Sequence, residues 1–115
     1  MISSNNRFHG HSSLNFVYKN GQVARSRWLT IKAVVNPKRK NSRIAVIISK
    51  KVLKGAVKRN RVRRQIYQYA ANLLPDLKNI YDIAIIVTSG ELFTETQPEI
   101  FSQLNQVIDQ LSIKK

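Results

Sequence analysis

The residue types best suited to chemistry lie at positions 58–64, which read Lys-Arg-Asn-Arg-Val-Arg-Arg and hold five cations in seven residues. Arginine suits phosphate because its planar guanidinium group donates two parallel hydrogen bonds, whereas lysine offers only a point charge. If these residues begin a helix with Val62 facing inward, Asn60 and Arg64 point directly outward and the guanidinium groups cover a wide arc. The pattern predicts an anion-binding helix face, on which Asn60 contacts a phosphate, a 2′-hydroxyl or a neighbouring backbone group.

Three lysines precede this cluster, at positions 50, 51 and 54. The free N–H groups of a helix N-terminus favour anions. Like charges three or four residues apart destabilise a helix by roughly a few tenths of a kcal/mol per pair, so the cluster is more typical of a binding surface than of a solvated helix face. The predicted anion-binding residues are Lys50, Lys51, Lys54, Lys58, Arg59, Asn60, Arg61, Arg63 and Arg64.

Charge is divided unevenly along the 115 residues. Residues 1–64 hold seventeen Lys and Arg and no acid, whereas residues 65–115 hold three Lys and all six acids, so the two parts carry +17 and −3. Uncompensated cations repel one another unless salt or an anionic partner screens them. An acidic membrane fits poorly because no predicted helix is both basic and lined with Trp, Phe or Leu, and a merely solvated surface leaves the asymmetry unexplained. RNA or DNA fits best.

Other classes of function lack the residues that they need. The chain has no cysteine, which excludes disulfides and thiolate zinc sites, and His9 and His11 form only a weak metal-binding pattern. The six carboxylates are expected to be ordinary surface residues outside the basic part, where acid–base catalysis or Mg²⁺ binding would therefore lack ligands. No apolar run is long enough to span a bilayer or to form a secretory signal. We expect a soluble, cytoplasmic protein with no metal site and no catalytic side chain.

A length of 115 residues predicts a single domain over residues 1–115. Residues 1–11 are polar and basic and are expected to form a flexible arm. A first helix follows, capped by a serine, and runs to about Asn20. Gly21 is expected to end it by taking a left-handed conformation.

The remaining elements alternate between strand and helix patterns. Two-residue alternation predicts strand structure over residues 23–35, with aliphatic side chains at positions 29, 31, 33 and 35 on one face. The runs at 44–48 and 83–87 are apolar on both faces, which is typical of strands covered on each side, and the first of them is expected to be central. A long helix over 56–74 has one buried stripe, and a capping box beginning at Thr96 opens a last helix. The order is α, two or three strands, α, β, α, an α+β domain with helices packed on a small sheet.

Residues 49–64 resemble the hallmark of the protein subunit of bacterial ribonuclease P. That hallmark is a hydroxyl–Lys–Lys segment, a Gly/Ala-rich link, and then Ala-Val-x-Arg-Asn-Arg-x-[Lys/Arg]-Arg. Here it stands as Ser49-Lys50-Lys51, Gly55 and Ala56-Val57-Lys58-Arg59-Asn60-Arg61-Val62-Arg63-Arg64. Upstream, residues 6–8 resemble the family's Arg-Leu arm, and residues 17–21 resemble its Val-aromatic-x-x-Gly helix end. The resemblance implies an α-β-β-β-α-β-α fold of the ribosomal protein S5 domain 2-like type, with a left-handed strand–helix–strand crossover against the usual rule.

The resemblance also implies a function, the maturation of transfer-RNA 5′ ends. In this family a catalytic RNA hydrolyses the phosphodiester with Mg²⁺ that the RNA mainly holds, and the protein binds both that RNA and precursor transfer RNA. No protein partner is required, and no catalysis is expected from the protein alone. The basic helix start would face the catalytic RNA, while the first helix and one sheet face would form a cleft for the single-stranded 5′ leader. The implied cleft residues are Leu14, Tyr18 and Lys32.

Two of these cleft residues depart from the family's pattern. Leu14 and Lys32 stand where aromatic residues are common, so Leu14 is expected to stack less well on a base and Lys32 to contact the leader by charge. Residues 65–68, which follow the basic cluster, are less basic than in many members.

Three other functions remain as alternatives. A ribosomal or general RNA-binding protein would share the charge pattern but would have no role in cleavage. A stand-alone nuclease would hydrolyse RNA without an RNA partner. A helix-turn-helix DNA-binding regulator fits least, because strand patterns flank the basic helix on both sides.

Overall fold

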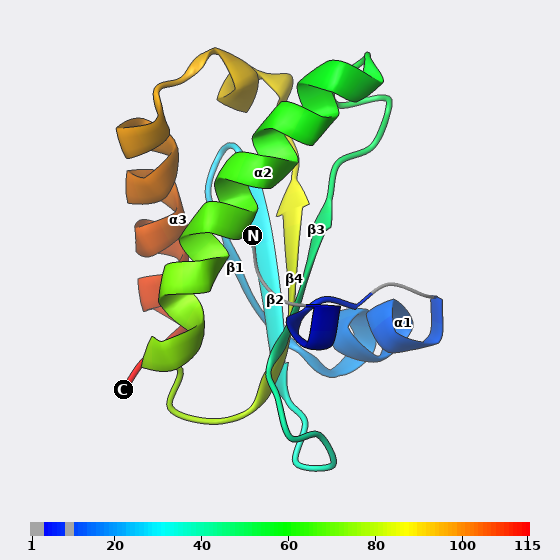
Figure 1. Cartoon of the computed structure of the whole chain (residues 1–115), viewed down its shortest axis with the longest axis vertical. Coiled ribbons are helices and arrows are strands. Elements are labelled where there is room, and N and C mark those ends of the chain that lie inside the picture. The colour runs from blue at the N-terminus through cyan, green and yellow to red at the C-terminus, as the bar shows by residue number, and fades with distance from the viewer. Residues whose placement is uncertain (1–3, 9–10) are drawn as a thin grey trace.

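The computed structural model describes residues 4–8 and 11–115 (Figure 1). Its centre is a four-stranded sheet. The strands are β1 (Gln22–Arg25), β2 (Leu29–Val35), β3 (Arg43–Ile47) and β4 (Tyr81–Val87), in the spatial order β1-β2-β4-β3. The helices are α1 (His11–Asn20), α2 (Ala56–Leu73) and α3 (Gln97–Leu111). Short 3₁₀ segments are η1 (Ser4–Asn6), η2 (Leu74–Asp76) and η3 (Gly90–Thr94). The expected α-β-β-β-α-β-α order of an α+β fold is confirmed.

The sheet order corrects one expectation about the two apolar runs. The run at 44–48 supplies β3, which is an edge strand, and the central position between β2 and β3 belongs to β4. β3 is still apolar on both faces because both are covered, and Arg7 forms a parallel bridge to Ile44 at its outer edge. In Figure 1, β3 and β4 both run upward, α2 lies in front, and β4 lies to the left of β3. The crossover is therefore left-handed, as the resemblance implies.

One face of the sheet is covered by α2 and α3 (Figure 1). The predicted stripe of α2 is buried, at Val62, Ile66, Tyr69 and Leu73. α3 begins at the predicted capping box, where the Thr96 hydroxyl accepts a hydrogen bond from the Glu99 N–H at 3.4 Å. Tyr69 joins the two helices, because its hydroxyl donates to Asn105 Oδ1 at 2.7 Å and its ring meets the Phe101 ring edge-on at 5.5 Å. We call this side the closed face, and it holds the main hydrophobic core.

The opposite side of the sheet is covered only in part by the described residues, and we call it the open face. α1 packs across one end of it, against β2 and β4. A small second cluster of buried side chains forms there, made of Phe8, Val17, Ala45 and Ala84. Ile47 and Ile86, which pair across β3 and β4 on the same face, remain partly exposed.

Three local features add to the sequence pattern. Within the expected flexible arm, residues 4–6 form η1 and Arg7 bridges to β3, whereas residues 1–3, 9 and 10, with His9 among them, lie outside the described residues. Gly21 ends α1 without a left-handed conformation; a Cβ there would lie 2.6 Å from the Val17 carbonyl oxygen, so close approach requires the glycine. Val35 is exposed at the end of β2 rather than part of the buried aliphatic face.

Within the described residues, no helix combines the length and the apolar character needed to cross a bilayer.

Candidate nucleic-acid interface

The start of α2 is fixed by the turn that precedes it. Gly55 has a φ of +89°, in the region that favours glycine, and its carbonyl accepts a hydrogen bond from the Arg59 N–H at 3.1 Å. No side chain caps this helix, and its first turn has no acidic residue. The positive end of the α2 dipole is therefore open to an external anion beside the segment that carries the three lysines.

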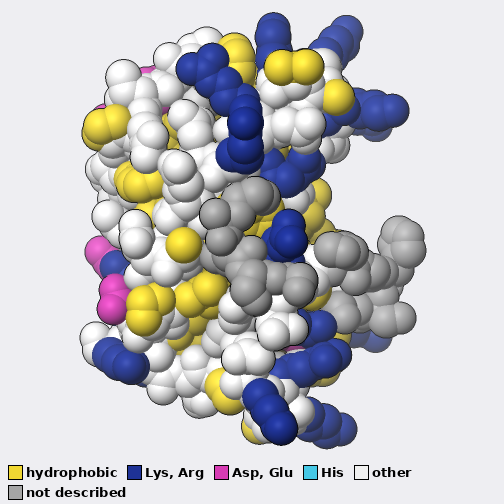
Figure 2. Space-filling view, in the orientation of Figure 1, with side chains coloured by type: hydrophobic (Ala, Val, Ile, Leu, Met, Phe, Trp, Pro, Cys, Tyr) yellow, Lys and Arg dark blue, Asp and Glu magenta, His cyan; other side chains and the backbone are white. Residues whose placement is uncertain are grey.

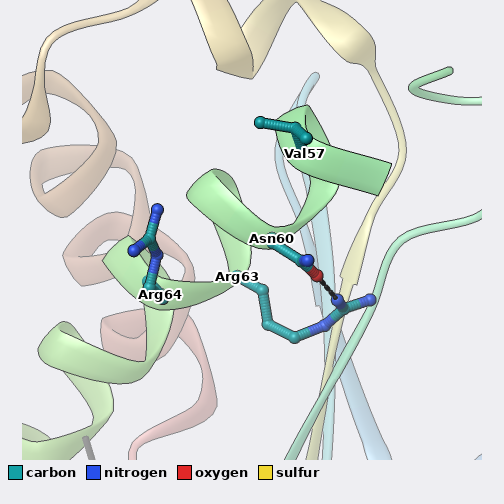
Figure 3. A pocket seen from close by; sticks show the side chains of 4 residues that line it. All are labelled: Val57, Asn60, Arg63 and Arg64. Atoms are coloured by element: carbon teal, nitrogen blue, oxygen red, sulfur yellow. Dashed lines mark hydrogen bonds between the residues drawn. The ribbon is translucent and has the colours of Figure 1, made fainter. Parts of the chain in front are cut away.

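The nine predicted anion-binding residues all lie in this region, and seven of them are exposed. Arg59 and Arg63 are partly buried. The Arg59 guanidinium donates to the Leu53 carbonyl at 3.0 Å and so fastens the lysine-bearing connection to α2. The Arg63 guanidinium donates to Asn60 Oδ1 at 3.0 Å (Figure 3). Asn60 therefore orients a neighbouring guanidinium group instead of satisfying the backbone.

Within the part of the chain that the structure describes, these cations have no carboxylate counter-ions. Among the described residues, the ion pairs are Arg43–Asp82 and Lys114–Asp109, and neither involves residues 50–64. Figure 2 shows Lys and Arg side chains gathered along the upper, right and lower parts of the molecule, while Asp and Glu appear on the left side. The basic cluster is therefore an exposed surface whose charge is left for salt or an anionic partner to screen.

A hollow of about 390 Å³ lies on α2 within this cluster (Figure 3). Val57, Asn60, Arg63 and Arg64 line it, and Arg63 and Arg64 extend to opposite sides. Val57 is 81% exposed, so the hollow presents an apolar surface between cations. A ribose or base fits such a surface while the guanidinium groups reach phosphates on either side.

A second hollow of about 330 Å³ adjoins the first, because Arg63 lines both. We call it the groove; it is lined by Arg7, Phe8, Leu14, Ala45, Val46, Ile47, Arg63 and Tyr67. The Nε atom of Arg7 is buried in the described structure without a hydrogen-bond partner, which is uncommon for a buried polar atom. In Figure 2 the surface is hollowed at its right edge, below the uppermost group of Lys and Arg side chains.

Sequence reasoning missed most of the groove. Tyr67 follows Arg63 by four residues, which places both on one side of α2, and that spacing could have revealed it. Phe8 and Ile47 gave no such signal, because their place in the groove depends on contacts between distant segments.

The three predicted cleft residues lie in two places along α1. Leu14 lines the groove. Tyr18, one turn further on, meets Lys32 of β2, whose Nζ lies 4.9 Å from the centroid of the Tyr18 ring. Tyr18 is 37% exposed and also borders a separate shallow hollow with Asn15 and Lys19. An aromatic ring and a cation thus stand together on the open face, as stacking and phosphate contacts require.

Asp82 was expected to be ordinary surface, and that expectation is wrong. Asp82 is 1% exposed and accepts hydrogen bonds from Arg43 Nε at 2.9 Å, Arg43 Nη2 at 2.8 Å and Asn36 Nδ2 at 2.7 Å. Burial by itself raises the pKa of Asp82, but the hydrogen bonds from Arg43 and Asn36 outweigh it and hold that pKa below its usual range. The Arg43 guanidinium lies 4.8 Å from the Phe8 ring centroid, so the network also fixes a wall of the groove.

Comparison with known proteins identifies the family. The family model for ribonuclease P matches residues 2–112. The ribonuclease P protein component of a Pseudanabaena species is 34% identical over 89 residues, which cover 77% of each chain. The chain belongs to the ribonuclease P protein family. A further ribonuclease P protein component, from a Synechococcus species, is 27% identical over 116 residues, covering 98% of this chain and 86% of the relative.

Solved ribonuclease P proteins share the fold. The Staphylococcus aureus protein matches with a TM-score of 0.85 at 22% identity, over 96% of this chain and 98% of that one. The Thermotoga maritima protein matches with a TM-score of 0.76 at 16% identity, over 86% of this chain and 91% of that one. The fold expected from the resemblance is thereby confirmed.

As a ribonuclease P protein component, the chain is part of an endoribonuclease that acts in transfer-RNA processing. Membership of this family implies an RNA partner. The resemblance carried by residues 49–64 therefore identified the correct family.

Proposed function

We propose that this chain binds the catalytic RNA of ribonuclease P through residues 50–64 and the 5′ leader of precursor transfer RNA through the groove and the open face. In this way it assists Mg²⁺-dependent removal of the leader. The observation that carries the proposal is the continuity of the surface: exposed cations without carboxylate partners at the start of α2 pass, through Arg63, into an apolar groove.

Charge supports the contact with the catalytic RNA. Binding of Lys and Arg to phosphates releases the counterions condensed on RNA, and a surface without internal ion pairs loses no internal salt bridge on binding. Arg59 and Asn60 hold the connection and Arg63 in place, so less side-chain entropy is lost when the surface meets RNA. The exposed guanidinium groups of Arg61 and Arg64 are the contacts that we expect to be strongest.

The shape of the groove supports the contact with the leader. Its walls include Leu14, which is partly exposed, and the largely buried rings of Phe8 and Tyr67, so the groove offers a mainly apolar surface to an unpaired base. Arg7 also lines the groove and is partly exposed, so its positive charge favours a phosphate bound there. Double-stranded RNA could not use such a groove, because its bases are stacked and paired.

The described side chains do not suit a catalytic metal site. No group of three His, Cys, Asp or Glu residues lies close enough together, within the described residues, to hold a metal ion. As the family resemblance implies, we assign the Mg²⁺ ions and the chemical step to the RNA partner and expect no hydrolysis by the protein alone. The chain itself binds and orients RNA, in the cytoplasm, without needing a protein partner.

Reconstitution tests the proposal. The protein is added to a bacterial ribonuclease P RNA at low Mg²⁺, and cleavage of precursor transfer RNA is followed. The proposal requires faster cleavage with the protein than without it, and no cleavage by the protein alone. Binding without any stimulation would favour a general RNA-binding protein, and cleavage without RNA would favour a stand-alone nuclease; either result overturns the proposal.

A further inference from the structure

We infer that Phe93, in the acidic half of the chain, is a positioning residue that orients Lys58 and Arg61 of α2 for RNA binding. The Nζ of Lys58 and the Cζ of Arg61 each lie 5.4 Å from the centroid of the Phe93 ring. One ring thus meets two of the nine predicted anion-binding side chains. This inference rests on the proposed contact between α2 and the catalytic RNA.

The Phe93 ring offsets charge repulsion between two cations at the start of α2. Lys58 and Arg61 are three residues apart on one side of the helix, where like charges repel, and neither is paired with a carboxylate among the described residues. The face of an aromatic ring is negative, so a cation is attracted to it even at an exposed site. Unlike a carboxylate, the ring is neutral and therefore leaves the positive charge available to phosphate.

Phe93 is held firmly enough to act as a support. It belongs to η3, which packs against α2 beside its start (Figure 1). Leu92, the preceding residue, is fully buried. A Cβ on Gly90 would lie 2.6 Å from the Val52 carbonyl oxygen, so η3 also approaches the lysine-bearing connection closely. The Trp28 indole N–H donates to Glu91 Oε2 at 3.2 Å and anchors the same turn to the sheet.

The contacts of Phe93 with Lys58 and Arg61 therefore join the acidic and the basic halves of the chain. The acidic half contributes no cation to the basic cluster, but its η3 segment carries the ring against which two of the cluster's cations rest. With their directions restricted, the two side chains lose less conformational freedom on binding RNA. Loss of the ring should weaken RNA binding although no charge is removed.

The test compares Phe93→Leu with Phe93→Tyr and with the matched control Phe101→Leu. Phe101 is also a partly buried aromatic packed on the core, but its ring meets Tyr69 and no cation among the described residues. We expect Phe93→Leu to weaken binding to a bacterial ribonuclease P RNA about three- to tenfold. Phe93→Tyr keeps the aromatic face, so its affinity for the RNA should stay within about twofold of the wild type. The affinity of Phe101→Leu should do the same. Thermal unfolding first shows that all three variants are folded.

A double-mutant cycle separates positioning from mere stability. Phe93→Leu is also placed in a K58Q/R61Q background, where the ring has no cation to orient and should have no further effect on affinity. An equal loss in both backgrounds, or a loss for Phe101→Leu as large as for Phe93→Leu, overturns the inference. If K58Q/R61Q weakens RNA binding and Phe93→Leu does not, the inference fails and the proposed function stands. If K58Q/R61Q binds RNA as the wild type does, the proposed contact fails and the inference fails with it.

Discussion

The two faces of the sheet are built from the same strands but differ in what covers them. On the closed face, α2 and α3 bury the side chains of all four strands in one continuous core. On the open face, α1 and Phe8 cover one end, and the second cluster has only four buried residues. Burial of apolar surface stabilises the fold roughly in proportion to area, so most of the stability comes from the closed face, which leaves the open face available for ligand binding.

Successive residues of β4 show this division within a single strand. Ile83, Ile85 and Val87 point into the closed face and are at most 2% exposed. Ala84 and Ile86 point to the open face, where Ala84 is covered by the second cluster and Ile86 is partly exposed. An apolar run that appears uniform in sequence therefore serves the core with one set of side chains and, with the other, the open face that we propose binds the leader.

The largest effect is expected at the charge pair that closes one end of the open face. Asp82→Ala leaves Arg43 and Asn36 without their acceptor, and Arg43 remains largely buried, with 13% of its side chain exposed. Removing one partner of a buried pair costs about 3–5 kcal/mol. The matched control is Asp109→Ala. The Asp109 side chain is 70% exposed, and its Oδ1 lies as far as 3.9 Å from Lys114 Nζ. Such surface pairs contribute about 0–1 kcal/mol. Urea unfolding of both variants measures the difference, and equal losses would show that burial of the Asp82 pair is unimportant.

The same pair predicts how stability depends on pH. The pKa of Asp82 is lowered in the folded protein, so its contribution is present above the unfolded value of about 3.9 and is lost as the pH falls through the lower folded pKa. Unfolding by acid should therefore steepen below about pH 4 in the wild type. Asp82→Ala should show a shallower fall over that range. Parallel curves for the two proteins would contradict the assignment.

The adjacent isoleucines of β4 test the two faces directly. Ile85→Ala opens a cavity in the closed face and should destabilise the protein by about 2–5 kcal/mol. Ile86→Ala removes a partly exposed side chain, so we expect a loss of stability below about 1 kcal/mol but weaker binding of precursor transfer RNA that carries a leader. Urea unfolding and filter binding on both variants measure this. The comparison fails if the two substitutions destabilise the protein equally.

Local patterns predicted most of the fold. The α2 stripe, the Thr96 capping box and the apolar runs that became β3 and β4 are confirmed because each depends on residues close in sequence. The order of the strands was not predictable in the same way, since a run apolar on both faces fits an edge strand as well as a central one when both faces are covered. Asp82 gave no sign of its burial because its partners, Asn36 and Arg43, lie more than thirty residues away.

The proposed binding surface divides in the same manner. The basic cluster is contiguous in sequence, so its residues could be predicted together, and the structure keeps them on one surface. The groove instead gathers Arg7, Leu14, Ile47 and Tyr67 from four separate segments. Tyr67 alone among these four follows a predicted anion-binding residue, Arg63, by one helical turn, and that spacing indicates a shared side of α2.

Single arginines of α2 are expected to have a moderate effect, on affinity and not on stability. Arg64→Ala should weaken binding of the catalytic RNA by about 1–3 kcal/mol, because a charge-assisted contact is lost. It should also flatten the slope of log affinity against log salt by about 0.7–0.9. Lys78→Ala is the control, an exposed cation outside the basic cluster, and should change neither quantity. Filter binding across a salt series measures both quantities. An unchanged slope for Arg64→Ala would show that Arg64 does not contact a phosphate.

The smallest effect is expected at Tyr18, on the open face. Base stacking on an aromatic ring contributes about 1–3 kcal/mol. Because Lys32 already lies over the Tyr18 ring, we expect Tyr18→Ala to lose about 1 kcal/mol of binding free energy. The loss should appear for precursor transfer RNA with a leader and be absent for mature transfer RNA. Phe16→Ala provides the control, because Phe16 is an aromatic on the same helix, 47% exposed, and lies about 200° around the axis from Tyr18. An equal loss for both RNAs, or for both variants, would mean that the open face does not bind the leader through Tyr18.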